Sequence, residues 1–361
     1  MDSIDSKKGP WPEFTSELRR IVKKHVRSTH EPESLKGYDR RKPRKGLEFE
    51  IVYSFYLPRS REQTFCAVCQ VEKKFRGGSI FWWSDGYLRP VGHCCVEKLL
   101  GRVQVRIARQ DYIERERHDR ATKRLSMVRE GLPSLIDDLQ ELMQDRAFEK
   151  REKICQQLNL VMQPLARRLG AAFVHNDGWL IVERRQRQYG KEATHRGAAG
   201  EAGNERFAFV QDRVGRLNGS AAIDHRLDPR QLVRGAVNAL KDTQGEIEAI
   251  EFEMVKASRL EGLLKRIGNA LERVDLALHI LAAVRVFFGR ENLATVCRWA
   301  NDPDNGWIVG SLTPVRAGLK WKADDEFETE VVLPLDYRAP QLPALQSMQS
   351  FLKRDIDDLA A

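Results

Sequence analysis

Apolar residues recur at helical spacing close to the start of the chain. Between Glu13 and Val26 they occupy one face of a predicted helix, and lysines and arginines occupy most of the other face. The apolar positions are Phe14, Leu18, Ile21, Val22 and Val26. The pattern therefore predicts an amphipathic helix that packs one side against a core.

Shorter apolar segments follow, with the alternation and β-prone composition typical of strands. Residues 47–58 (LEFEIVYSFYLP) predict one strand. Residues 79–83 (SIFWW) and 87–91 predict two more, and the turn sequence Ser84-Asp85-Gly86 lies between them. We expect these two strands to form a hairpin, and the polar segment 70–78 (QVEKKFRGG) before them to be a loop.

The rest of the chain is mainly helical, with strand-rich interruptions. Helical patterns cover 95–169 and 229–301, whereas 173–184 predicts a hairpin strand around Asn-Asp-Gly and 301–335 ends in further strands. Residues 190–204 are rich in Gly and Ala and predict a flexible segment. The last apolar pattern predicts a C-terminal docking helix with Leu345, Met348, Phe351, Leu352 and Ile356 on one face.

A shift of 128 residues aligns two parts of this helical region. The aligned apolar pairs are Leu132 with Leu260, Leu135 with Leu263, Ile136 with Leu264 and Leu139 with Ile267. The same shift aligns Asp177-Gly178-Trp179 with Asn305-Gly306-Trp307, and Ile181 with Val309. The hypothesis is a repeated helix-plus-hairpin module at 126–184 and 254–310. Because any two amphipathic helices can match in phase, the alternative is a chance alignment.

Composition narrows the class of protein. A chain of 361 residues is long enough for two or three domains and a sizeable core. It has no run of 18 apolar residues, and its first residues (MDSIDSKKGPWPEF) lack the apolar stretch of a signal peptide. We therefore expect a soluble, cytoplasmic protein with no membrane partner. In a reducing cytosol disulfides are disfavoured, so clustered cysteines indicate a metal site or redox chemistry.

The charge is unevenly distributed along the chain. The formal net charge is +9, and residues 1–110 hold 23 Lys and Arg against 13 Asp and Glu. The other residues are close to neutral, with 38 against 39. A basic end favours a polyanionic partner, because Lys and Arg that contact phosphates release condensed counterions. The alternative is a tail that only aids solubility.

Four of the six cysteines lie between residues 66 and 95. Cys66-Ala-Val-Cys69 has the spacing of a zinc knuckle, and the predicted hairpin and the start of a helix follow it. Knuckle, hairpin and helix in this order describe a treble-clef zinc site. Its second pair of ligands comes from the helix start, where His93, Cys94 and Cys95 compete. Cys95 is favoured because it lies where the helix begins, and the fourth ligand is either His93 or Cys94.

Other interpretations of the cysteine cluster fit the sequence less well. A redox Cys-x-x-Cys typically opens a helix in a βαβ setting, whereas the polar segment 70–78 follows here. Unligated buried thiols are the plain structural alternative. A catalytic zinc keeps one position open for water, and a site with four ligands leaves none. We therefore expect Zn²⁺ as a structural cofactor, and Cys155 and Cys297 as packed thiols outside the site.

The segment also resembles a known kind of module. The form C-x-x-C, β-hairpin, V-G-x-x-C-x-x-K-L recurs in phage, plasmid and other mobile-element proteins. Here its positions are Cys66, Cys69, Val91, Gly92, Cys95, Lys98 and Leu99. The resemblance covers about 36 of the 361 residues. It implies a zinc site, and it implies association with nucleic acid only through the proteins in which such modules occur.

Basic residues surround the cysteine cluster. The segment 36–45 (KGYDRRKPRK) is too polar to bury itself and predicts an exposed arm. The candidate phosphate contacts are Arg40, Arg41, Lys42, Arg44 and Lys45 in this arm and Lys73, Lys74 and Arg76 before the hairpin. The neighbouring aromatic residues Tyr38, Phe75, Trp82 and Trp83 suit base stacking or, for each one taken singly, the domain core.

The predicted fold is α+β: a basic N-terminal domain with a treble-clef-like zinc site, then a mainly helical part with two small β units. The expected segments are 1–46 (basic helix and arm), 47–125 (zinc-binding domain), 126–220 and 221–340 (helix-plus-hairpin modules) and 341–361 (C-terminal helix). No G-x-S-x-G, Walker or G-x-G-x-x-G motif indicates catalysis. We expect a non-enzymatic nucleic-acid-binding subunit or accessory factor. The alternative is a protein–protein adaptor whose helices bind other subunits.

Overall fold

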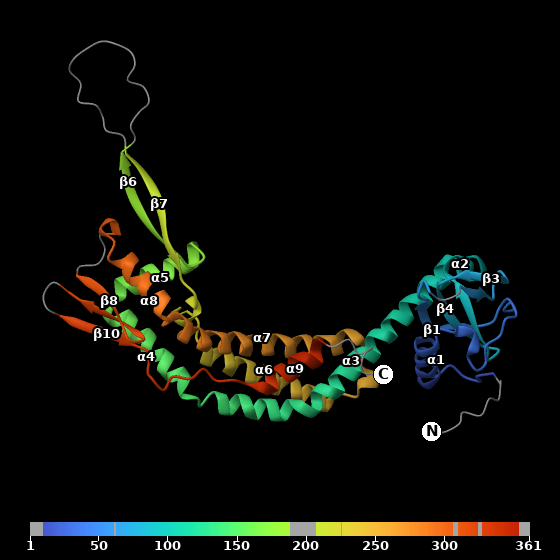
Figure 1. Cartoon of the computed structure of the whole chain (residues 1–361). Helices are drawn as coiled ribbons and strands as arrows, with labels where there is room; N and C mark the ends of the chain where they lie inside the picture. The colour runs from blue at the N-terminus through green and yellow to red at the C-terminus, as the bar shows by residue number, and fades with distance from the viewer. Residues whose placement is uncertain are drawn as a thin grey trace, which may run out of the picture. The chain divides into compact units, whose positions relative to one another are not determined.

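The computed structural model describes residues 10–60, 63–187, 207–224, 226–305, 310–323 and 327–353. Helices predominate and the strands form small antiparallel sheets, so the fold is of the mixed α+β class, as predicted (Figure 1). The chain divides into two compact units. Unit 1 comprises Met1–Arg124, Glu251–Glu261 and Arg354–Ala361, and unit 2 comprises Leu125–Ile250 and Gly262–Lys353. The finer division into five segments stays a prediction.

Unit 1 begins with helix α1 (Ser16–Thr29). The Thr15 hydroxyl accepts a hydrogen bond from the backbone N–H of Leu18, over 3.1 Å, and so caps the helix. His30, in the left-handed conformation, ends it. The predicted amphipathic helix is confirmed, three residues further along the chain at each end, because the cap sets where it starts.

A three-stranded antiparallel sheet forms the middle of unit 1. It consists of β1 (Phe49–Tyr56), β4 (Gly77–Trp83) and β5 (Leu88–Gly92), in the order β1-β4-β5. One face packs against α1, through residues such as Val52 and Ile80. The other face packs against α2 (His93–Leu100) and the start of α3 (Arg102–Leu142). The predicted strand and hairpin are confirmed.

The segment predicted as a loop contains a strand. β3 (Val71–Phe75) pairs with β2 (Thr64–Cys66), so that prediction was wrong, and Lys73 and Lys74 lie on a strand. A solvated two-stranded ribbon needs no apolar alternation, so its sequence gives little signal. At the end of β3 the Phe75 ring packs closely against Gly78. Only glycine fits there, because a Cβ at position 78 would lie 2.2 Å from the ring.

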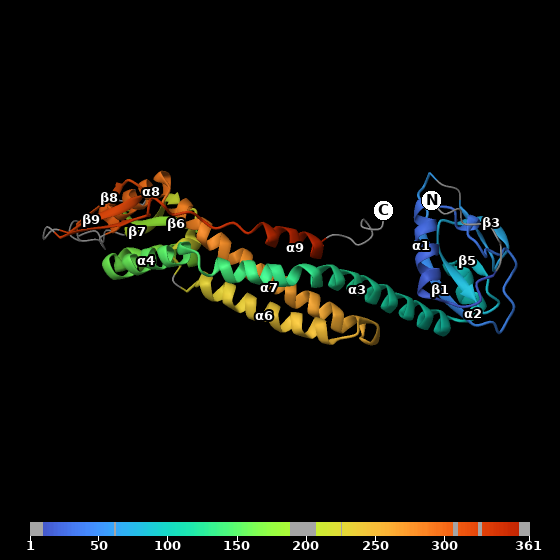
Figure 2. The ribbon, with the colours of Figure 1, turned by 90° about the horizontal axis from the view of Figure 1, so that it is seen from below.

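Unit 2 contains most of the helical part. Its helices are the C-terminal half of α3, α4 (Arg146–Val161), α5 (Gln163–His175), α6 (Pro229–Ala249), most of α7 (Ala257–Phe287), α8 (Arg290–Ala300) and α9 (Pro343–Lys353). Figures 1 and 2 show α6 and α7 side by side. The apolar residues of α3 predicted as a stripe are buried at Leu132, Leu135, Ile136 and Leu139. The helical regions and the C-terminal helix, as far as residue 353, are confirmed.

Unit 2 also holds two small sheets. One is the ribbon of β6 (Trp179–Arg187) and β7 (Phe207–Arg216), and the other contains β8 (Ser311–Val315), β9 (Gly318–Lys322) and β10 (Glu328–Val332) in the order β10-β9-β8. The hairpin turn predicted at Asn-Asp-Gly was wrong, whereas the strand predicted after it is confirmed as β6. The residues Asn-Asp-Gly end α5: the N–H of Gly178 bonds to the carbonyl oxygen of Ala172, and Asp177 and Gly178 have positive φ. A left-handed residue that directly follows a helix ends it, so here the same residues terminate α5 and do not turn a hairpin.

The repeat hypothesis stays a prediction. At an offset of 128 residues α5 falls on α8, which follows α7 as α5 follows α4. The decisive residues Gly306, Trp307 and Val309 lie outside the described residues, as does the Gly- and Ala-rich segment 190–204.

Candidate metal centre

The first two cysteines lie on a tight turn between two strands. β2 ends at Cys66 and β3 starts at Val71, and the backbone N–H of Gln70 bonds to the carbonyl oxygen of Cys66 over 2.9 Å. Gln70 has a φ of 59°, which lets the chain reverse within four residues. Cys66 is buried and Cys69 is exposed at the surface of the turn.

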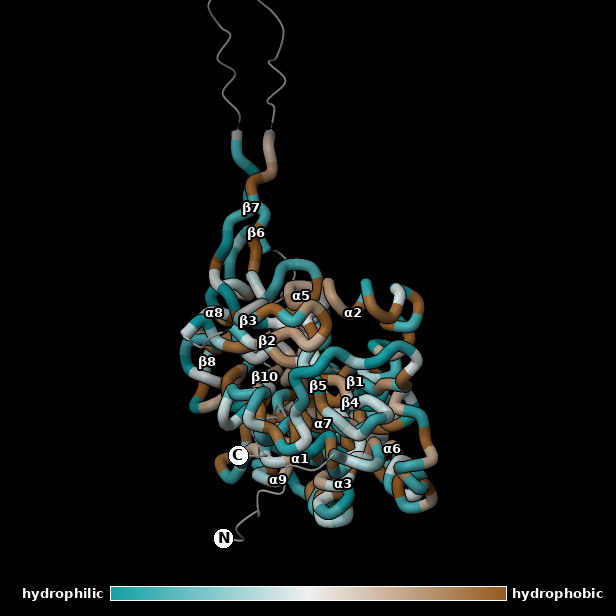
Figure 3. Tube along the Cα trace, turned by 90° about the vertical axis from the view of Figure 1, so that its right-hand side faces the viewer, coloured by the Kyte–Doolittle hydropathy of each residue, from teal (hydrophilic) through white to brown (hydrophobic). Residues whose placement is uncertain are grey.

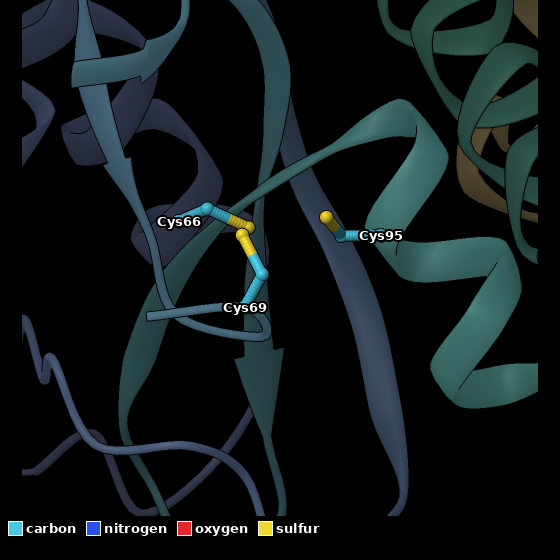
Figure 4. A group of neighbouring side chains, drawn as sticks. All are labelled: Cys66, Cys69 and Cys95. Atoms are coloured by element: carbon cyan, nitrogen blue, oxygen red, sulfur yellow. The ribbon is translucent and has the colours of Figure 1, made fainter. Parts of the chain in front are cut away.

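The third cysteine comes from the start of a helix. β5 ends at Gly92, α2 begins at His93, and Cys95 lies in its first turn. The Sγ atoms of Cys66, Cys69 and Cys95 all lie within 4.8 Å of one another. Figure 4 shows the three side chains converging from the turn and from the helix. This arrangement is compatible with a metal ion, because thiolates about 2.3 Å from one zinc ion approach one another this closely.

The pKa values of Cys66 and Cys95 also fit a nearby cation. Burial raises the pKa of Cys66, but backbone N–H groups of Cys69, Gly92 and Val68 outweigh it, and the pKa lies below its ordinary value. Burial and hydrogen bonding with Cys69, together with the charge of Cys66, raise the pKa of Cys95 to about 12. The pKa of Cys66 is thus lowered, and the negative charge of Cys66 helps to raise the pKa of Cys95. A cation among them removes this repulsion, so the donor set fits a metal ion.

The fourth ligand stays a prediction. Cys94 is exposed and lies outside the group of three sulfur atoms. His93 is the first residue of α2, and its side chain is outside the described part of the structure. The structure therefore brings Cys66, Cys69 and Cys95 together and leaves His93 and Cys94 as the predicted candidates.

The basic arm, residues 36–45, is attached to strand β5. The N–H of Leu88 donates to the carbonyl oxygen of Gly37 over 2.8 Å, and the N–H of Asp39 donates to the carbonyl oxygen of Leu88 over 2.9 Å. Tyr38 and Leu88 thereby form a short parallel bridge. The arm follows the edge of the sheet and has a defined backbone path here.

A buried arginine strengthens this attachment. The side chain of Arg89 on β5 is 3% exposed. It donates to the carbonyl oxygen of Arg41 over 3.0 Å and forms ion pairs with Asp39 and Asp85, each over 2.7 Å. Burial raises the pKa of Asp39, but the N–H and guanidinium of Arg41 and the charge of Arg89 outweigh it and hold that pKa below its ordinary value.

The turn that carries Cys66 and Cys69 contacts the arm directly. The side-chain amide of Gln70, next to Cys69, donates to the carbonyl oxygen of Arg40 over 2.8 Å. The Arg40 guanidinium lies 4.6 Å from the centre of the Phe65 ring and pairs with Glu72 over 2.8 Å. Three elements of the cysteine module (β2, the turn and β3) therefore hold this one arm residue.

The predicted nucleic-acid contacts differ in exposure. The exposed arm residues are Arg40, Arg41, Lys42, Arg44 and Lys45. Within the described residues, Lys42, Arg44 and Lys45 form no ion pair, whereas Arg40 and Arg41 pair with carboxylates. Arg76 is half-buried, and the side chains of Lys73 and Lys74 are outside the described part. Pro43, within the arm, is buried.

The aromatic candidates belong to the core. Trp83 is 1% exposed, and Tyr38, Phe75 and Trp82 pack against buried clusters of unit 1. The packing alternative therefore holds for all four. Cys155 and Cys297 are buried thiols of unit 2, as expected.

Sequence reasoning missed Gln70, Asp39 and Arg89 as the residues that position the arm. The only available signal was an arginine within the apolar strand 88–92, since a buried Arg requires acceptors.

No family model, curated protein or solved structure matches the chain. Among the described helices, none is long and apolar enough to cross a membrane.

Proposed function

We propose that the protein is a non-enzymatic nucleic-acid-binding subunit or accessory factor whose metal module holds the basic arm in place. The observation that supports this is the attachment of residues 37–41 to β5 and to the cysteine turn, with the basic side chains outward. An arm with a defined path loses less conformational entropy on binding than a mobile tail.

The proposed ion is Zn²⁺, held by Cys66, Cys69 and Cys95 with His93 or Cys94 as the fourth ligand. Thiolate sulfur favours zinc over calcium or magnesium, which prefer oxygen ligands. The role is structural: the ion would tie the turn before β3 to the start of α2, in addition to the hydrogen bond from the N–H of Ala67 to the carbonyl oxygen of Pro90. Small domains of this kind obtain much of their folding free energy from the metal.

The proposed contacts are with phosphates. Lys42, Arg44 and Lys45 are exposed, and Arg40 and Arg41 can exchange their carboxylate partners for phosphate oxygens. Contacts of this type carry no information on the base sequence. We therefore expect binding to unrelated sequences with similar affinity and with a strong dependence on salt concentration.

The test compares the wild type with the variant Lys42→Ala/Arg44→Ala/Lys45→Ala. Fluorescence anisotropy on unrelated duplexes and single strands should show uniformly weaker binding for the variant. Each lost contact should flatten the log–log salt dependence by roughly 0.9 for duplex DNA or 0.7 for single strands. The matched control Arg234→Ala/Lys241→Ala/Lys265→Ala removes three exposed cations of unit 2. Equal binding of wild type and arm variant near 150 mM salt, roughly the physiological value, refutes the proposal.

One observation favours the adaptor as a second candidate. Val103 and Ile107, four residues apart on one face of α3, are 62% and 55% exposed, and neighbouring apolar side chains at a surface suit a protein partner. An adaptor would bind nucleic acid only weakly at low salt. That binding would vanish near physiological ionic strength in wild type and arm variant alike, so the same titration separates the two functions.

A further inference from the structure

The ribbon β6–β7 of unit 2 extends away from the helices of its unit (Figure 1). The strands pair over their whole length, from Trp179 opposite Arg216 to Arg187 opposite Phe207. They form a separate two-stranded sheet. A two-stranded ribbon of this kind has little intrinsic stability in water, so the fold must anchor it elsewhere.

The ribbon is anchored through Ile181 and Arg184, the third and sixth residues of β6. The indole N–H of Trp299 donates to the carbonyl oxygen of Ile181 over 3.0 Å. Arg184 pairs with Asp212, Asp302 and Asp304, over 2.6 to 2.8 Å. One arginine therefore fixes the strand to the body of unit 2, and with its three carboxylate partners it forms a group of formal charge −2.

The part of the ribbon beyond this anchor has a different composition. Residues 185–187 and their cross-strand partners 207–209 read RQR and FAF, with two arginines, one glutamine and no Asp or Glu. Phe209 is 73% exposed and lies directly opposite Arg185, which is also exposed. Figure 3 shows that, in the outer part of the ribbon, one strand is hydrophilic and the other is mainly hydrophobic. Phe209 lies in the apolar run 207–210 (FAFV), and such a run at a surface beside arginine suits a binding partner.

We propose that this ribbon binds in the major groove of duplex DNA. This inference rests on the proposed nucleic-acid function and names its substrate class. The major groove of B-form DNA is about 12 Å wide and admits a two-stranded β-ribbon, whereas the A-form groove of RNA is too narrow. Arginine and glutamine are donors that suit base edges and phosphates, and phenylalanine suits the thymine methyl group.

The alternative role of the arginines is protection of open strand edges against pairing with other chains. That role predicts aggregation when the charge is removed and makes no use of the exposed phenylalanine. DNA binding predicts a monodisperse variant with lower affinity.

The test uses the full chain with the variant Arg185→Ala/Phe209→Ser. Its matched control is Leu160→Ser/Arg234→Ala, which removes one exposed apolar residue and one exposed arginine from helices of the same unit. Probes are a DNA duplex of about 20 base pairs, two helical turns, and the RNA duplex of the same sequence. The ribbon variant should bind the DNA at least about five-fold more weakly than wild type and control. Its affinity for the RNA duplex should be unchanged.

A second readout locates the groove. Bound wild type should protect guanine N7, which lies in the major groove, from methylation by dimethyl sulfate, and the ribbon variant should restore the reaction. Unchanged DNA affinity, an equal loss on RNA, or aggregation with intact DNA binding overturns the inference. If the arm variant loses affinity while the ribbon variant does not, the proposed function stands and this inference falls. If wild type binds no nucleic acid near 150 mM salt, about the physiological value, both fall.

Discussion

The side-chain amide of Gln70 donates a hydrogen bond to the backbone carbonyl oxygen of Arg40 over 2.8 Å. Gln70 directly follows the cysteine turn, and Arg40 is the first arginine of the basic arm. One side chain thus links the position of the metal ligands to the path of the segment proposed to bind phosphates. We therefore expect a change that disorders the turn to disorder the arm as well.

The first prediction tests this link with Gln70→Asn. Asparagine tolerates the left-handed backbone of this position, but its shorter side chain does not reach Arg40. We expect nucleic-acid affinity to fall about three- to ten-fold, the equivalent of one hydrogen bond, with unchanged zinc content. Anisotropy and elemental analysis measure the two quantities. Hydrogen exchange of residues 38–44 should quicken, and unchanged exchange together with unchanged affinity would show that the contact does not order the arm.

The second prediction concerns the metal. Protein purified without added metal should contain about one equivalent of zinc, and Cys66→Ser should lose it and lower the melting temperature of unit 1. Cys155→Ser is the matched control, because its thiol is buried in unit 2 and donates to the carbonyl oxygen of Ala222, a hydrogen bond that serine can also form. Less than a tenth of an equivalent in a folded wild type with reduced thiols would refute the site.

The third prediction distinguishes the candidates for the fourth ligand. Cys94 is exposed and lies apart from the three converging sulfur atoms, so Cys94→Ser should keep the zinc content and the stability of unit 1. His93→Ala should lower zinc affinity, measured by competition with a chelator. The reverse result, with loss in Cys94→Ser only, would assign the place to Cys94.

The fourth prediction concerns the buried ion pairs of Arg89. Arg89→Met leaves the carboxylates of Asp39 and Asp85 without their buried partner, and should lower the free energy of unfolding of unit 1 by about 3–5 kcal/mol. Arg41→Met is the control, because Arg41 pairs with Asp39 at the surface and is 74% exposed. Denaturant unfolding measures both. Equal small effects would mean that the network adds nothing to stability.

The same network predicts a dependence on pH. The pKa of Asp39 in the folded protein lies below its ordinary value of about 3.8, so its contribution is present above that value and is lost as the pH falls through the folded pKa. Asp39→Asn should therefore destabilise unit 1 most near neutral pH, and its difference from wild type should shrink below about pH 4. Metal release at acid pH affects both proteins, so only their difference is compared. A difference that stays constant with pH would contradict the prediction.

Local pattern was sufficient for several elements. The apolar spacing of Leu18, Val22 and Val26 predicts helix α1, and the SIFWW run with its Ser-Asp-Gly turn predicts the β4–β5 hairpin. The Cys-x-x-Cys spacing and the helix start at Cys95 predict that Cys66, Cys69 and Cys95 lie close together, as they do. These features depend on neighbours within a few residues, where period and turn chemistry are informative.

Tertiary contacts decided what local pattern left open. β3 forms because it pairs with β2. Asn-Asp-Gly ends a helix because the residues before it form α5, whose apolar side is buried. The path of the basic arm depends on Arg89, fifty residues away from Asp39, and on Gln70, thirty residues away from Arg40. No periodicity encodes such pairs, because a buried ion pair or a side-chain-to-carbonyl bond is defined only when the fold brings its partners together. The amino-acid sequence by itself determined the helices, the hairpin and the three clustered thiols, while the tertiary structure alone decided how the arm is held.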